Sequence, residues 1–160
     1  MRVCRSLLFA ASAACSLLVA AGVGAASVTV QTEAGALRLT EVAQGLEHPW
    51  SLAFLPDGRM LVTEREGRLR VVTAAGALSQ PLGGVPRVHA VGQGGLLDVV
   101  LSPDYATDQR IYFSFAQPTD KGARTAVARA RLNLEALKLE DVQVIFTQRD
   151  DPSGGGHFGS

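Results

Sequence analysis

Two glycine-rich turns in the sequence each present one hydrogen-bonding side chain beside a strand-like segment. The first turn, residues 92–95, reads Gly-Gln-Gly-Gly and runs directly into an apolar segment. The second begins with three glycines at residue 154 and continues into His157 and Phe158. Glycine accepts positive φ and lets a ligand approach the backbone closely. The carboxamide of Gln93 and the imidazole of His157 could therefore orient a bound molecule, and a neutral imidazole can accept a proton near neutral pH.

The two turns belong to a pattern of short strands that repeats along the chain. Strand-like segments separated by tight turns cover residues 37–42, 48–55, 59–63 and 68–72, and a second set covers 95–101, 110–114, 125–132 and 142–146. We interpret the segment 133–140 as a hairpin connection. Equivalent Pro-Asp pairs in the two sets begin at residues 56 and 103, 47 positions apart. A four-stranded repeat of about 40–50 residues is typical of a β-propeller blade, so the sequence predicts an all-β propeller fold.

The innermost strand of each propeller blade lines the central channel, and we call the turns that precede these strands the lead-in turns. They carry His48, Gln93 and His157 in successive repeats, so these polar groups are predicted to converge on a concave site at one end of the channel. A structural role within its turn is the favoured interpretation of His48. Gln93 as an ordinary turn residue and His157 as a surface histidine remain open alternatives. We assign no role to His89, and we expect Asp98 to be buried with a structural hydrogen bond.

Composition and missing motifs exclude several classes of function. The net charge is zero, so nothing indicates a nucleic-acid partner. The sequence has no histidine or cysteine spacing typical of a metal site, no EF-hand loop, no phosphate-binding loop and no nucleophile elbow. If the protein is an enzyme, a bound cofactor is therefore expected to supply the reactive group.

Residues 1–26 have the features of a secretory signal peptide: a basic start, an alanine-rich apolar stretch and small residues at its end. The alternatives are a membrane anchor or a lipoprotein site at Cys15. With the signal removed, we expect a periplasmic or secreted protein without a membrane span.

Residues 27–36 are then a short polar lead, and residues 37–160 are a partial propeller of about two to two and a half blades. Because a propeller needs about 4–8 blades to close, we expect an N-terminal fragment; a complete small β domain is the alternative.

Several motifs resemble the soluble PQQ-dependent sugar dehydrogenases of the glucose/sorbosone dehydrogenase family, and specifically the bacterial aldose sugar dehydrogenase branch. They are Gly-Leu-Glu-His-Pro-Trp at 45–50 with its Leu-Pro-Asp-Gly turn at 55–58, Thr-Glu-Arg at 63–65, Gly-Arg-Leu-Arg at 67–70, Gly-Gln-Gly-Gly-Leu-Leu-Asp at 92–98 and Gly-His-Phe-Gly at 156–159. The resemblance covers about residues 37–160. It implies a six-bladed propeller with pyrroloquinoline quinone (PQQ) at the mouth of the channel.

The resemblance also implies an activity, which is oxidation of an aldose at its anomeric carbon to the lactone. His157 would be the catalytic base and a cofactor contact, and Gln93 would hydrogen-bond the quinone. Calcium would polarise the quinone, with its ligands beyond residue 160, and this chain alone is expected to be inactive. Gly156 stands where glucose-specific members have aspartate, so glucose specificity is not implied. Expected partners are the sugar and an external electron acceptor; a homodimer stays open, and a non-catalytic propeller that binds carbohydrate or protein is the alternative function.

Overall fold

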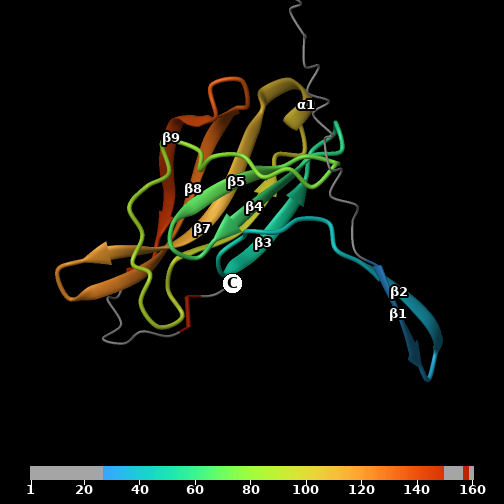
Figure 1. Ribbon diagram of the computed structural model, residues 1–160. Helices are drawn as coiled ribbons and strands as arrows, with labels where there is room; N and C mark the ends of the chain where they lie inside the picture. The colour runs from blue at the N-terminus through green and yellow to red at the C-terminus, as the bar shows by residue number, and fades with distance from the viewer. Residues whose placement is uncertain (1–26, 150–156, 159–160) are drawn as a thin grey trace, which may run out of the picture. The chain divides into compact units, whose positions relative to one another are not determined.

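The computed structural model describes residues 27–149 and 157–158, which form almost entirely antiparallel strands (Figure 1). The expected signal peptide, residues 1–26, lies outside the described residues. The chain divides into one compact unit that ends at Thr40 and another that begins at Glu41. Within the described part, none of the helices has the length and apolar character that crossing a bilayer requires.

The first unit contains a two-stranded hairpin of β1 (Ser27–Thr32) and β2 (Gly35–Thr40). Its turn uses Gly35 at a φ of 125°, and the Thr32 hydroxyl donates to the Gly35 carbonyl over 2.8 Å. The prediction that the strand at 37–42 belongs to the first blade is wrong, because among the described residues β2 pairs with β1 and not with a strand of that blade. The polar lead expected at 27–36 contains β1, whose alternating pattern is masked by its small and polar residues.

The first blade is a three-stranded sheet in the order β3 (Pro49–Phe54), β4 (Met60–Glu64) and β5 (Arg68–Val72). The Pro-Asp-Gly sequence makes the predicted turn between β3 and β4, with Gly58 at a φ of 84°. Asp57 closes this turn by accepting hydrogen bonds from the backbone and side chain of Arg59. The strand positions therefore follow the sequence prediction, although the sheet has three strands instead of four.

The second blade has four strands in sequential order. They are β6 (Leu96–Leu101), β7 (Arg110–Thr119), β8 (Gly122–Asn133) and β9 (Lys138–Thr147), and the short helix α1 (Tyr105–Asp108) separates β6 from β7. Only residues 134–137 connect β8 to β9, so the predicted hairpin connection is confirmed and is shorter than expected. The innermost strands of the two blades share an irregularity: the register of β3 shifts between Pro49 and Leu52, and that of β6 shifts between Leu96 and Val99.

The hydrophobic core lies between the two sheets. The first blade contributes Leu55, Leu61, Leu69 and Val71, and the second contributes residues including Leu96, Val99, Ile111, Phe113 and Phe115. On β8 the inward positions are Ala126, Ala128 and Ala130, all fully buried. Small side chains at every second position leave room for the aromatic rings of β7, and the alternation matches the period of a strand. Two sheets stacked face to face in this way are what neighbouring propeller blades require.

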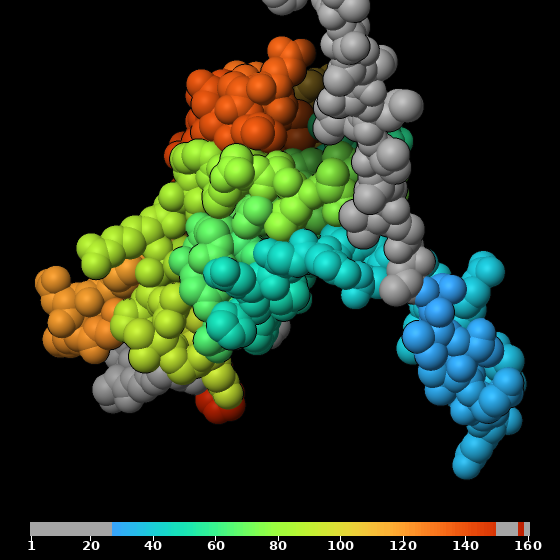
Figure 2. Space-filling model, in the orientation of Figure 1, coloured from blue at the N-terminus to red at the C-terminus, as the bar shows by residue number. Residues whose placement is uncertain are grey.

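The long connection between β5 and β6, residues 73–95, runs over the surface of the second unit (Figure 2). Its buried Leu82 donates a backbone hydrogen bond to Leu69 in the first blade, and Gly83 pairs with Lys138 in the second. The connection is therefore hydrogen-bonded to both blades before it reaches the glycine-rich lead-in turn.

Candidate functional site

The second lead-in turn is packed so closely that two of its positions require glycine. A Cβ atom on Gly94 would lie 2.4 Å from the His89 carbonyl oxygen, and one on Gly95 would lie 2.1 Å from the Arg65 carbonyl oxygen. Gly95 also has a φ of 147°, which side chains disfavour. The backbone of this turn therefore lies directly against the first blade, and the backbone on both sides of Gln93 is closely packed.

Gln93 and His157 come together in the structure, although 64 residues separate them. The Gln93 Oε1 atom accepts a hydrogen bond of 2.8 Å from the His157 backbone N–H. Because a backbone N–H can only donate, this contact requires the oxygen of the carboxamide to face His157 and directs its NH₂ group elsewhere. Both residues are exposed at this place. The Gln93 carboxamide thus lies against the backbone of His157, and both residues are accessible to a ligand from solvent.

Phe158 anchors the third lead-in turn to the second blade. Its ring is buried with Leu97, Ala116 and Ala123, and a Cβ atom on Gly94 would approach it to 3.2 Å. Its carbonyl accepts a hydrogen bond of 3.0 Å from the Thr125 hydroxyl. The residue after His157 therefore holds the backbone in place, and His157 itself sits at a φ of 62° with its side chain exposed.

His48 has the structural position that the sequence analysis favoured. Its Nδ1 lies 2.6 Å from Glu66 Oε1, and its carbonyl accepts a hydrogen bond of 3.1 Å from the Arg65 backbone. Burial raises the pKa of Glu66, but hydrogen bonds from its own backbone and from His48 outweigh this effect and lower the pKa. His48 therefore stabilises the first lead-in turn. Asp98 departs from expectation, because it is exposed and its backbone N–H donates to the Ser114 hydroxyl.

Three consecutive residues at the end of β4 and directly after it make contacts that the sequence did not predict. The Thr63 hydroxyl donates to the Leu97 carbonyl over 2.7 Å, which joins the two blades. Glu64 is completely buried and accepts a hydrogen bond of 2.5 Å from the Glu47 backbone in the first lead-in turn. Arg65 donates over 2.7 Å to the Gly92 carbonyl in the second. The Thr-Glu-Arg motif at 63–65 was the available signal; it contributes to the family resemblance and overlaps the predicted strand 59–63, but the spacing of its residues does not indicate their partners.

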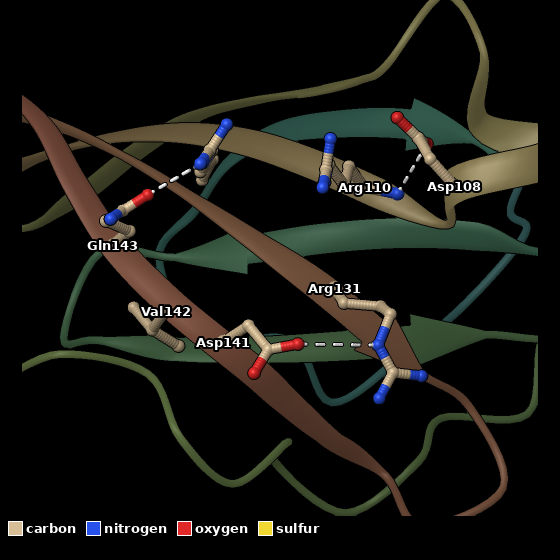
Figure 3. A pocket seen from close by; sticks show the side chains of 7 residues that line it. Asp108, Arg110, Arg131, Asp141, Val142 and Gln143 are labelled. Atoms are coloured by element: carbon tan, nitrogen blue, oxygen red, sulfur yellow. Dashed lines mark hydrogen bonds and ion pairs between the residues drawn. The ribbon is translucent and has the colours of Figure 1, made fainter.

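A polar hollow lies elsewhere on the second blade. It has a volume of about 420 Å³ and is lined by residues of β7, β8 and β9 and the end of α1 (Figure 3). Two of its three arginines are engaged locally: Arg129 donates to Gln143, and Arg131 Nε lies 3.7 Å from Asp141. Neither Gln93 nor His157 lines this hollow, so it is separate from the candidate site. Among the described residues, no group of three or more histidines, cysteines or carboxylates is arranged to hold a metal ion.

The folded segment consists of neighbouring blades of a β-propeller with polar groups gathered at their lead-in turns. Residues 46–160 match the sequence profile of the family described as Glucose / Sorbosone dehydrogenase. The chain is 52% identical over 116 residues to the aldose sugar dehydrogenase YliI of Escherichia coli (strain K12), covering 71% of this chain and 31% of that protein. The chain therefore belongs to the glucose/sorbosone dehydrogenase family, and the resemblance in its motifs is confirmed.

Solved structures support the same assignment. The apo form of the soluble aldose sugar dehydrogenase from Escherichia coli matches with a TM-score of 0.70 and 49% identity, over 74% of this chain and 35% of the other. The PQQ-bound aldose sugar dehydrogenase from Streptomyces coelicolor matches with a TM-score of 0.61 and 32% identity, over 78% and 34%. The predicted all-β propeller fold is thereby confirmed. The chain spans about a third of the length of these relatives.

Proposed function

We propose that the protein is a PQQ-dependent aldose dehydrogenase that oxidises the anomeric carbon of a sugar to the lactone. The proposal concerns the full protein, in which the segment described above supplies the first blades. Family membership and the PQQ-bound relative from Streptomyces coelicolor support it. The observation that carries it is the contact of Gln93 with His157, because two groups distant in sequence meet where a ligand could reach both.

The donor and acceptor groups at this place fit a quinone cofactor with carbonyl and carboxylate oxygens. The Gln93 oxygen is engaged by the His157 backbone, so its NH₂ group is the part that can donate to such an oxygen. The exposed His157 imidazole is suited to accept the anomeric hydroxyl proton, since a neutral imidazole has one nitrogen that acts as an acceptor. When bound, PQQ supplies the acceptor for the hydride from the sugar carbon. Calcium would be held by residues after position 160.

Export through the signal segment 1–26 would place the protein in the periplasm or outside the cell, where it meets free sugars. Oxidation of each sugar would leave two electrons on the cofactor, so an external electron acceptor is needed to reoxidise it after each turnover.

The test is dye reduction by the full protein, reconstituted with PQQ and Ca²⁺ and supplied with a panel of aldoses. His157→Ala should lower the turnover number by about 10²–10⁴, the usual contribution of a positioned base, while PQQ still binds. His89→Ala is the matched control and should retain turnover, because we assign His89 no role. Normal turnover in His157→Ala would remove His157 from the mechanism. A full protein that reduces no dye with any aldose would support the non-catalytic binding propeller instead.

A further inference from the structure

Arg65 occupies the junction between the first two lead-in turns. Its backbone N–H donates to the His48 carbonyl, and its own carbonyl accepts the Leu96 N–H over 2.9 Å. Its side chain then turns toward the glycine-rich turn, where Nη1 donates over 2.7 Å to the carbonyl of Gly92. One residue of the first blade thus contacts the turn of its own blade and both ends of the turn that carries Gln93.

The side chain of Arg65 is held in a restrained environment. The Arg65 Nε atom is buried and has no hydrogen-bond partner among the residues that the structure describes. Its Cγ would lie 2.5 Å from a Cβ on Gly95, so the aliphatic part of the side chain lies against the backbone of the turn. A buried donor without a partner is costly. An apolar side chain could fill the same space without that cost, but it could not donate to the Gly92 carbonyl.

The hydrogen bonds of Arg65 continue into the candidate site. Gly92, at a φ of 60°, directly precedes Gln93, and the Gln93 oxygen accepts the His157 N–H. An unbroken series of contacts therefore runs from His48 through Arg65 and Gly92 to Gln93 and His157. The side chain of Arg65 is the link in this series that joins the first blade to the glycine-rich lead-in turn of the second.

We propose that Arg65 is a positioning residue, which fixes the turn of residues 92–95 so that the Gln93 amide faces the cofactor. This role rests on the proposed function, and it acts through Gly92 without contact to the reacting atoms. Loss of the guanidinium should let the carbonyl of Gly92 rotate and should widen the range of orientations of Gln93. Cofactor binding should then weaken more than sugar binding, because Gln93 is assigned to the quinone.

The test compares Arg65→Met, Arg65→Lys and the control Arg59→Met in the full protein. Methionine keeps most of the aliphatic length and removes every donor, while lysine keeps a cationic donor on a long side chain. Arg59 is a suitable control because its guanidinium pairs with Asp57 at the β3–β4 turn, away from the site. Two quantities are measured: amide hydrogen exchange of the peptide covering residues 89–97 without cofactor, and the dissociation constant for PQQ.

In Arg65→Met, exchange at the 89–97 peptide should be about tenfold faster and PQQ should bind about tenfold more weakly, with the sugar KM changed less than threefold. Arg65→Lys should recover most of both losses, and Arg59→Met should match the unsubstituted protein. Exchange and PQQ affinity of Arg65→Met equal to those of the control would overturn the proposal. Loss of folding in both Arg65 variants would also overturn it, by making Arg65 a residue of the fold alone.

Failure of the proposed function gives a different result. If the unsubstituted protein does not bind PQQ, the enzyme assignment is wrong, whatever the variants do. Faster exchange at residues 89–97 in Arg65→Met would still support control of the turn by Arg65, because that measurement requires no cofactor.

Discussion

Replacing Glu64 with glutamine should destabilise the protein strongly at neutral pH and only weakly in acid. Glu64 is fully buried, and its carboxylate accepts hydrogen bonds from the Glu47 backbone at 2.5 Å and from Arg68 Nε at 2.6 Å. Arg70 Nη1 lies 3.3 Å away. Glutamine has nearly the same shape but carries no charge, and its NH₂ group would face the two guanidinium groups. The substitution therefore removes the carboxylate that Arg68 and Arg70 share; Arg68 keeps its ion pair with Glu47 at 2.7 Å, whereas Arg70 loses the partner that it has at 3.3 Å.

The magnitude follows from burial. Removing one partner of a buried ion pair costs about 3–5 kcal/mol. The side chains of Arg68 and Arg70 are 28% and 15% exposed, so water can solvate them in part. We therefore expect a loss of about 2–4 kcal/mol in the free energy of unfolding at pH 7. The matched control is Glu66→Gln two residues away, whose carboxylate is 33% exposed and should contribute about 1 kcal/mol or less.

The pH dependence has a definite sign. Burial alone raises the pKa of Glu64, but hydrogen bonds from the Glu47 backbone and Arg68, with the nearby charges of Arg68 and Arg70, outweigh it and lower the pKa below 4.5. A carboxyl group with a lowered pKa in the folded state contributes its full stability above its unfolded pKa, and this contribution disappears as the pH falls through the folded value. The difference between the unsubstituted protein and Glu64→Gln should therefore shrink progressively below about pH 4.5.

Urea denaturation of the full protein, followed by circular dichroism at intervals from pH 7 to pH 3, measures this difference. The reasoning is refuted if Glu64→Gln and Glu66→Gln lose equal stability at pH 7. It is also refuted if the effect of Glu64→Gln is independent of pH, since that would show that the charge of Glu64 does not stabilise the fold.

Two further substitutions test the contacts between the blades. Thr63→Val keeps the shape of the side chain but leaves the Leu97 carbonyl without its donor, so urea denaturation should show a loss of about 1–3 kcal/mol, and Thr63→Ser should lose less. Gly95→Ala places a Cβ 2.1 Å from the Arg65 carbonyl oxygen. It should lower the free energy of unfolding by about 2–4 kcal/mol and should also weaken the binding of PQQ. Gly58→Ala is the control, because no atom lies within 4 Å of the new Cβ. It should lower the free energy of unfolding by about 1–2 kcal/mol, from the strain at its positive φ, and should leave PQQ affinity unchanged. Equal effects of the two alanine substitutions would contradict the packing argument.

Much of the fold could be predicted from the sequence because turn chemistry and strand period agree locally. The predicted strand 68–72 has the same bounds as β5, and the turn at Gly58 is where Pro-Asp-Gly indicated it. The partner of a strand is decided by distant residues, and periodicity carries no information about it. For that reason the strand near residue 37 was assigned to the first blade, whereas β2 pairs with β1.

The sequence was sufficient to predict that Gln93 and His157 lie together, but not which residues hold them in place. Two glycine-rich turns at equivalent places of a repeat were sufficient to bring Gln93 and His157 into one hypothesis, and the structure joins them by a hydrogen bond. Their catalytic and cofactor-binding roles remain predictions. The contributions of Glu64 and Arg65 could not be found in this way, because Glu64 depends on the Glu47 amide that strand pairing within the first blade brings near, and Arg65 depends on the Gly92 carbonyl that the stacking of blades brings near.

The triplet Thr63–Glu64–Arg65 has a consequence for protein engineering. Three adjacent residues bond to three separate segments, so the blades of this protein are not interchangeable modules. A chimera that exchanges the first blade for one from a relative must also take the matching glycine-rich turn, residues 92–95, from that relative. Otherwise the hydrogen bonds between the two blades will not match. Turns away from these contacts, such as the exposed residues 120–121 between β7 and β8, are the safer places for insertions and fusions.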